Sequence, residues 1–357
     1  MKCFEQLNFD FFCFVEKNHY FSISTSNGWS AILVIMKKKI FISLFSILSF
    51  VTISRAQQDP QLTQWMFDRM SFNPAFAGVD KMHCLQLFYR TQWTGFENSP
   101  QTTLFNYNGH APLADQTLGF GLSAFSETLG LESNTIMRGS FAYHHTIGAN
   151  KIAGGIQVGM LNKVLGTDWK YIDANDPLIT DLQKQQSSTV FDAALGLSFY
   201  KPDSYYAGVS LTHLNAAALE DLNYEMARHM YVCGGYNYPI NTDLVLRSNL
   251  LMKTDMKASP AIDVNANVLW KNMLWGGISY RMTDAISPMF GFQKVFPQKI
   301  SGRTTFDQLL RIGYSYDLTT SEIRNYSTGS HEVFLSYCFN VSQEPIKTYH
   351  VNPRFLY

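Results

Sequence analysis

Residues 262–270 read IDVNANVLW and carry the clearest structural pattern in the chain. Every second residue of this stretch is apolar, and Asp or Asn fills most positions between. Successive side chains of a strand point to opposite faces, so the stretch predicts a strand with one apolar and one polar face. A soluble sandwich buries the apolar face, whereas a barrel in lipid turns that face outward around a polar interior. The apolar row is Ile262, Val264, Ala266, Val268 and Trp270, and the polar row is Asp263, Asn265 and Asn267.

The same alternation recurs in about fourteen stretches, among them LRIGYSYDL at 310–318 and HEVFLSYCFN at 331–340. Typical lengths match the 9–11 residues with which a tilted strand crosses a bilayer, and an even number suits a bacterial single-chain barrel. The predicted strands lie near 82–90, 100–111, 117–126, 135–147, 150–165, 189–200, 203–213, 229–239, 242–254, 260–270, 273–282, 285–296, 306–319 and 329–341.

The connections between these stretches alternate in length. One set is mostly short, such as Gly148-Ala149, and the other is mostly longer, such as SETLGLESN at 126–134 and residues 166–188. Short periplasmic turns alternating with longer outer loops are typical of outer-membrane barrels. Two connections break the rule, because 283–284 is short and 297–305 is long. We predict an all-β fold, a transmembrane antiparallel β-barrel of about 14 strands in an up-and-down meander. A jelly roll or large sandwich is the alternative.

Composition supports a two-faced sheet. The chain has 28 basic and 28 acidic residues, so its formal charge of zero argues against a nucleic-acid partner. Charged residues make up 16% of the chain, below the roughly 25% of soluble domains. Aromatic residues reach 15% and are interleaved with polar ones, as a barrel wall requires.

The N-terminal region is predicted to contain a secretory signal peptide at 36–56. Lys37 to Lys39 are followed by an apolar run and then by Ser54-Arg55-Ala56, so cleavage is expected after Ala56. The run is shorter than the ~20 residues of a spanning helix, although a membrane anchor is the alternative. Residues 1–35 are interpreted as a mis-called upstream extension, or else as part of a longer signal-anchor.

Three cysteines follow the expected cleavage point: Cys84, Cys233 and Cys338. All three lie in strand-like stretches, and their odd number at such spacing predicts no disulfide framework. No CxxC pair is present for zinc.

No motif indicates an enzyme, a cofactor or a metal. His144 and His145 are adjacent in a predicted strand and must point to opposite faces, so they cannot bind one ion. DANDP at 173–177 lacks the glycine and later glutamate of a calcium loop and reads as a polar turn. Ser210 and His213 lie close in one strand, and a catalytic Ser/His pair in the lumen is left as an alternative. Gly154-Gly155 and similar pairs are expected to relieve crowding in the wall rather than to bind phosphate.

Residues 57–80 read QQDPQLTQWMFDRMSFNPAFAGVD, between the cleavage point and the first strand. They resemble the start of the PorP/SprF family of Bacteroidetes outer-membrane proteins, with its pattern QDPQ-S-Q-Y-M-F-N…NPA-[YF]-AG. Trp65 and Asp68 depart from the pattern, where Tyr and Asn are usual. Later stretches also resemble the family, in order, including YRTQWTGFENSPQT (89–102), LWGGISYR (274–281), LRIGYSYD (310–317) and GSHEVFLSY (329–337). The matching motif residues are Asp59, Pro60, Gln61, Gln64, Met66, Phe67, Asn73, Pro74, Ala75 and Gly78.

This resemblance implies a non-enzymatic outer-membrane barrel of the type IX secretion system. Its partners would be other secretion components, secreted proteins with C-terminal sorting domains such as gliding-motility adhesins, and outer-membrane lipid. A porin or transporter for solutes or lipophilic molecules is the alternative. The domains are then a periplasmic N-terminal segment at 57–80, the barrel at 81–341 and a C-terminal tail at 342–357. We hypothesise that 57–80 enters or braces the barrel base; a disordered leader is the alternative.

Overall fold

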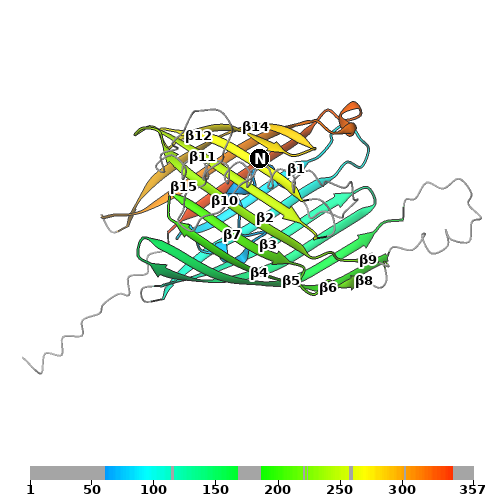
Figure 1. Cartoon of the computed structure of the whole chain (residues 1–357), viewed down its shortest axis with the longest axis horizontal. Helices are drawn as coiled ribbons and strands as arrows, with labels where there is room; N and C mark the ends of the chain where they lie inside the picture. The colour runs from blue at the N-terminus through cyan, green and yellow to red at the C-terminus, as the bar shows by residue number, and fades with distance from the viewer. Residues whose placement is uncertain are drawn as a thin grey trace, which may run out of the picture. The chain divides into compact units, whose positions relative to one another are not determined.

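The computed structural model describes residues 61–113, 116–167, 186–219, 222, 224–256, 260–300 and 303–340. Within them, fourteen antiparallel strands close into one barrel, in which chain neighbours pair and the last strand pairs with the first. Figure 1 shows these strands running obliquely along the barrel. The predicted barrel, strand number and meander are confirmed. The strands are β1 His83–Thr91, β2 Gln101–Leu113, β3 Gln116–Leu129, β4 Glu132–Ile147, β5 Asn150–Leu165, β6 Gln186–Lys201, β7 Tyr205–Thr212, β10 His229–Pro239, β11 Leu244–Thr254, β12 Ala261–Trp270, β13 Leu274–Arg281, β14 Ala285–Ile300, β15 Arg303–Thr319 and β16 Ser330–Phe339.

The barrel wall is apolar outside and polar inside. In β12, Val264 is 46% exposed and Trp270 is 45% exposed, whereas Asn265 and Asn267 are each 1% exposed. So many exposed large apolar side chains would promote aggregation in water, but they suit contact with hydrocarbon. No helix among the described residues is long and apolar enough to span a membrane. The most exposed apolar residues of the wall include Leu122, Met137, Phe141, Met160, Leu197, Ile278 and Phe290.

The two ends of the barrel differ in their connections. We call one the turn end, where short connections such as 148–149 and 202–204 lie, and the other the loop end, where 92–100, 213–228 and 320–329 lie. A small sheet of β8 (Ala218–Leu219) and β9 (Tyr224–Glu225) belongs to the loop end.

Two predicted connections are wrong, because the strands on both sides of each are longer than expected. The expected loop at 126–134 is a tight turn, because β3 continues to Leu129 and β4 begins at Glu132. The expected gap at 297–305 is likewise mostly strand, since β14 reaches Ile300 and β15 begins at Arg303. In both places the alternation of apolar and polar residues ends before the strand does, so periodicity underestimates the strand length.

Residues 61–80 lie inside the barrel, and we call them the lumen segment (blue in Figure 1). Trp65, Met70 and Phe76 are each at most 3% exposed. The segment contains two short 3₁₀ helices, η1 (Trp65–Phe67) and η2 (Pro74–Phe76). Asn73 begins η2, since its side chain accepts the Ala75 N–H at 3.0 Å and Pro74 occupies the first helical position. This part of the expected periplasmic segment is therefore a packed element of the barrel lumen.

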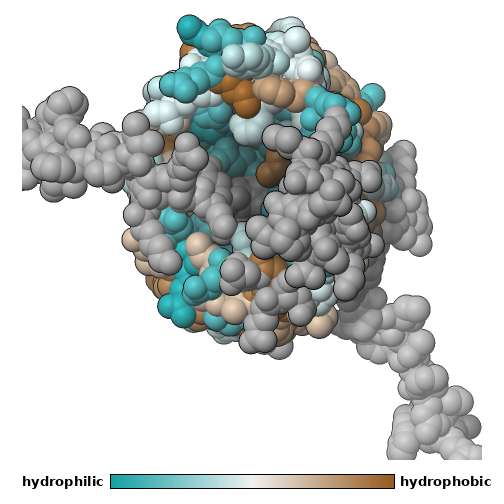
Figure 2. Space-filling model, turned by 90° about the vertical axis from the view of Figure 1, so that its right-hand side faces the viewer, coloured by the Kyte–Doolittle hydropathy of each residue, from teal (hydrophilic) through white to brown (hydrophobic). Residues whose placement is uncertain are grey.

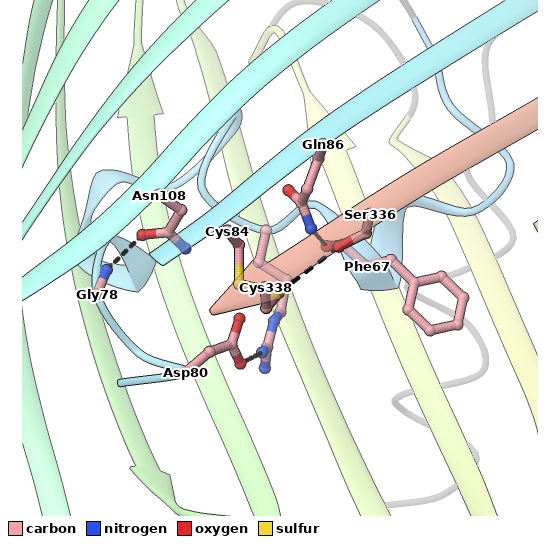
Figure 3. Close-up of a disulfide and its surroundings, with 9 residues drawn as sticks. Phe67, Gly78, Asp80, Cys84, Gln86, Asn108, Ser336 and Cys338 are labelled. Atoms are coloured by element: carbon pink, nitrogen blue, oxygen red, sulfur yellow. Dashed lines mark hydrogen bonds and ion pairs between the residues drawn. A yellow bond between two sulfur atoms is a disulfide. The ribbon is translucent and has the colours of Figure 1, made fainter. Parts of the chain in front are cut away.

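A disulfide joins Cys84 of β1 to Cys338 of β16, which corrects the expectation of no disulfide. The two residues face each other across the strand pair that closes the barrel. Figure 3 shows Gln86 beside Phe67 and Asn108 beside Gly78 near this bond, so the closing strands meet the lumen segment there. Closure of the barrel brings together residues that are 254 positions apart, which spacing along the chain cannot indicate. Cys233 is buried and free.

Candidate functional site

The start of the lumen segment contacts a cluster of buried charges, which we call the ion cluster: Arg90, Arg281, Asp317 and Glu332. These residues come from four strands, β1, β13, β15 and β16, and each is at most 4% exposed. Arg90 Nη2 lies 2.6 Å from Asp317 Oδ2, and Arg90 Nη1 lies 3.4 Å from Glu332 Oε2. Arg281 Nη1 lies 3.5 Å from Asp317 Oδ2, so the carboxylate of Asp317 is shared by two guanidinium groups.

The ion cluster binds the backbone of the lumen segment directly. Glu332 accepts hydrogen bonds from the backbone N–H groups of Thr63 at 2.6 Å and Gln64 at 2.8 Å. These N–H groups lie just before η1, so the carboxylate satisfies two buried backbone donors with charge-assisted hydrogen bonds. Thr63 Oγ1 donates to Asp317 at 2.9 Å and accepts from Arg90 Nη1 at 2.6 Å. The start of the segment is therefore fixed at the loop-end half of the barrel.

The middle of the lumen segment is bound by the opposite wall. Asn73 Nδ2 donates to the backbone carbonyls of Leu197 at 3.2 Å and Val209 at 3.3 Å. Ser210 Oγ donates to Phe72 O at 2.6 Å, and Ser198 Oγ donates to Ala75 O at 3.2 Å. The polar lumen face of β6 and β7 thus satisfies backbone groups that lie too deep for bulk water.

The end of the lumen segment contacts His144 and Asn108 near the turn end. His144 Nε2 lies 2.6 Å from Ala77 O, which can only accept, so this nitrogen donates. His144 Nδ1 then accepts from Tyr200 O–H at 2.8 Å. Gly78 N–H donates to Asn108 Oδ1 at 2.6 Å. His144 is buried and His145 is exposed, which confirms that the pair faces opposite sides of the wall.

Glycines in the wall make room for the lumen segment. A Cβ at Gly155 would lie 2.4 Å from Ala75 N, and one at Gly119 would lie 1.8 Å from Ala77 O. These atoms belong to backbone, which cannot turn aside as a flexible side chain does. By contrast, a Cβ at the neighbouring Gly154 would meet only Leu197 Cδ2 at 3.7 Å, an ordinary contact on the outer face. The expectation that these glycines relieve crowding in the wall thus holds at Gly155, where the lumen segment packs against the strand.

The Gly154-Gly155 pair offers a matched test of this packing. We expect Gly155→Ala to destabilise the folded protein by about 1–3 kcal/mol, because the added methyl must displace η2. Gly154→Ala is expected to change stability by less than about 0.5 kcal/mol. Thermal unfolding followed by the gel mobility of the folded barrel, with hydrogen exchange of residues 73–78, measures both variants. Equal behaviour of the two variants would show that η2 does not pack closely on β5.

Eight of the ten family-motif residues proposed from sequence lie in the lumen segment, where they make different contacts. Gln64, Asn73 and Ala75 are fully buried, and Gly78 has a φ of 75°, which favours glycine. Met66 packs in the main apolar cluster, and Phe67 stacks on Phe334 with ring centroids 4.7 Å apart. Pro74 begins η2, and Gln61 lines a cavity described below. Asp59 and Pro60 lie outside the described residues. The motif role of all ten residues stays a prediction.

Neither of the two kinds of site considered from sequence, a catalytic Ser/His pair and a metal site, is assembled in the part of the chain that the structure describes. His213 Nδ1 donates to Asp192 Oδ1 at 2.9 Å, whereas Ser210 binds Phe72 O, so the Ser/His pair engages different partners. No group of three or more His, Cys, Asp or Glu side chains is placed there to hold a metal ion. The DANDP turn lies outside the described residues.

Comparison with known families decides the assignment. The family model described as type IX secretion system membrane protein PorP/SprF matches residues 54–337, which include the lumen segment and almost the whole barrel. The chain belongs to the PorP/SprF family. The sequence resemblance is confirmed, and this PorP/SprF chain is an outer-membrane β-barrel of the type IX secretion system.

Other comparisons add the following. No curated protein matches the sequence. The Ralstonia pickettii toluene transporter TbuX is 12% identical, with a TM-score of 0.47, covering 84% of this PorP/SprF chain and 100% of its own. The P. putida toluene transporter TodX is 11% identical, with a TM-score of 0.44, covering 76% and 93%. The CymD monoaromatic hydrocarbon channel is 10% identical, with a TM-score of 0.47, covering 78% and 92%.

Proposed function

We propose that this protein is a non-enzymatic component that supports type IX secretion and anchors secreted proteins at the cell surface. The secreted proteins would bind through C-terminal sorting domains, as gliding-motility adhesins of Bacteroidetes are expected to do. The family match across residues 54–337 carries the proposal. The occupied lumen supports an anchoring role over an open solute channel, since the lumen segment is bound at its start, middle and end.

We infer that the loop end faces the outside, because longer loops of outer-membrane barrels are extracellular. Loops also carry most recognition, which makes residues 214–228 and 166–188 the first candidates for partner contact. In the first of these loops, Leu219 is fully buried and packs in a cluster with Ile136 and Leu161. This packing supports a preformed surface at the loop end. Residues 168–185 lie outside the described residues.

The remaining domain boundaries are part of the same proposal. Residues 36–56 serve as the signal peptide, with cleavage after Ala56, and residues 342–357 form a tail after the last strand. Residues 57–80 act as the N-terminal segment that occupies the lumen, and residues 81–341 form the barrel. N-terminal sequencing of the protein from native outer membranes tests the cleavage point.

The anchoring role predicts specific partners. Crosslinking in native membranes, followed by purification of the barrel, is expected to recover type IX secretion components and a secreted protein with a sorting domain. A variant in which Gly-Ser-Asn-Gly replaces residues 214–228 tests the role of this loop. We expect it to fold, because the inserted residues can join the paired ends Thr212 and His229, but to recover less of the secreted protein. Recovery of an empty barrel that conducts steady ion current in planar bilayers would instead support the porin function.

A further inference from the structure

A partly enclosed cavity lies between the lumen segment and the wall. About 90 Å³ of it is accessible to the centres of water-sized molecules, enough for several of them. Figure 2 looks onto the loop end and shows a hollow there, with hydrophilic residues (teal) on its visible inner wall. Most of the cavity lining is apolar or aromatic, as in small-molecule sites. Its main apolar residues are Leu62, Trp65, Phe72, Leu104, Phe125 and Ile136.

Two polar groups of the lumen segment face this cavity without hydrogen bonds. Asp68 is 2% exposed and neither of its carboxylate oxygens has a hydrogen bond of normal geometry, and Trp65 is 3% exposed with an unpaired Nε1–H. Ser71 and Asn106 bond to each other at 3.1 Å, and their weaker polar contacts with Asp68 offset only part of the cost of burying its carboxylate. Buried polar groups are nearly always paired, so these two groups need a partner within the cavity, either water or the polar group of a ligand. Trp65 and Asp68 are also the two positions at which this chain departs from its family pattern.

The other charges of the cavity already have partners. Arg138 Nη2 lies 2.7 Å from Asp192 Oδ2, and Asp263 Oδ1 lies 3.4 Å from Arg281 Nε. Lys253 also lines the cavity, and its side chain is likewise not without a partner.

Asp68 is thus the charge that the cavity leaves uncompensated. It lies on the lumen segment, outside the spanning strands, and burial raises the pKa of its carboxyl to about 6. Ser71, Asn106 and Arg69 oppose this rise to a smaller extent.

We propose that the cavity binds a protonated amine carried on an apolar body, with the ammonium group on Asp68. The apolar body would lie against Phe72, Phe125 and Ile136. Trp65 Nε1–H would meet an acceptor on the same ligand or a water that arrives with it. The amine belongs either to a free alkylamine or to a lysine side chain of a peptide that enters from the loop end. This inference stands apart from the anchoring function and concerns the cavity alone.

Calorimetric titration of the purified full chain in detergent tests the proposal, with n-hexylamine, n-hexanol and hexanoate as probes. We expect hexylamine to bind about 10- to 100-fold more tightly than hexanol, because only the amine forms a charged hydrogen bond with Asp68. Binding is expected to strengthen as pH rises through about 6, since a proton on Asp68 competes with the ammonium. A short acetylated peptide with one central lysine distinguishes a side-chain ligand from a free amine.

The matched variant is Asp68→Asn, which keeps the shape of the side chain and introduces the residue usual in the family. It is expected to remove the preference for hexylamine over hexanol, whereas the same change at an exposed aspartate of the turn end, Asp203→Asn, keeps it. Equal binding of amine and alcohol to the unaltered protein would overturn the proposal without any variant. So would unchanged amine binding in Asp68→Asn.

Discussion

Replacing Arg90 by methionine is expected to release the start of the lumen segment and to destabilise the folded barrel by about 3–5 kcal/mol. Arg90 is 1% exposed and contacts Asp317 at 2.6 Å, Glu332 at 3.4 Å and Thr63 Oγ1 at 2.6 Å. Methionine fills a similar volume but leaves two buried carboxylates with less compensation. Removing one partner of a buried ion pair is far more destabilising than removing the whole pair.

Hydrogen exchange of residues 61–70, together with thermal unfolding followed by gel mobility, measures this effect. Arg324→Met is the control, since Arg324 is exposed on the 3₁₀ helix η4 (Glu322–Asn325). The double variant Arg90→Met/Glu332→Gln should recover part of the lost stability, because it also removes the Glu332 carboxylate that the loss of Arg90 leaves unpaired. If exchange of residues 61–70 stays as slow in Arg90→Met as in the unaltered protein, the ion cluster does not fix the segment.

The wall of the barrel was predictable because lipid outside and a polar lumen inside impose a period of two. In β12, the row Asp263, Asn265 and Asn267 faces inward as the alternation predicts. Periodicity specifies the face of each residue and the number of strands. It fails at strand ends such as Leu129 and Glu132, where the alternation of apolar and polar residues breaks down before the strand ends.

The partners of the lumen segment were not predictable by the same route. Arg90 lies 227 residues from Asp317 and 242 from Glu332, and their meeting depends on closure of the barrel and on the stagger of its strands. A signal was nevertheless present, because each charge lies on the polar row of its strand, and Arg90, Arg281 and Glu332 lie in strands with no other Asp, Glu, Lys or Arg. A buried row charge needs an opposite charge nearby, so these residues could have been grouped as candidates.

The cysteines illustrate the same limit. An odd number of cysteines in apolar strands is a sound argument against a disulfide framework in a small secreted domain. In a closed barrel, however, the last strand of the meander pairs with the first. Since β1 and β16 become neighbours only on closure, Cys84 and Cys338 oppose each other although they lie at the two ends of the barrel sequence.

Loss of the Cys84–Cys338 bond is expected to destabilise the folded barrel by about 2–4 kcal/mol. The bond closes a loop of 254 residues in the unfolded chain, and restricting so long a loop removes much of its conformational freedom. The same loop makes the unfolded chain more compact. Fully denatured, non-reduced protein should therefore migrate faster on a gel than reduced protein, and Cys84→Ser should migrate like the reduced form with or without reductant.

Cys233→Ser provides the control, because Cys233 is buried and free, and this variant should keep the mobility difference of the unaltered protein. The pairing of β1 with β16 does not depend on the bond alone, since nine residue pairs from His83–Phe339 to Thr91–His331 lie in register between them. Cys84→Ser is thus expected to form a closed barrel that melts at a lower temperature rather than an open sheet. Identical gel mobility and melting of Cys84→Ser and the unaltered protein would mean that the two cysteines stay reduced in the folded barrel.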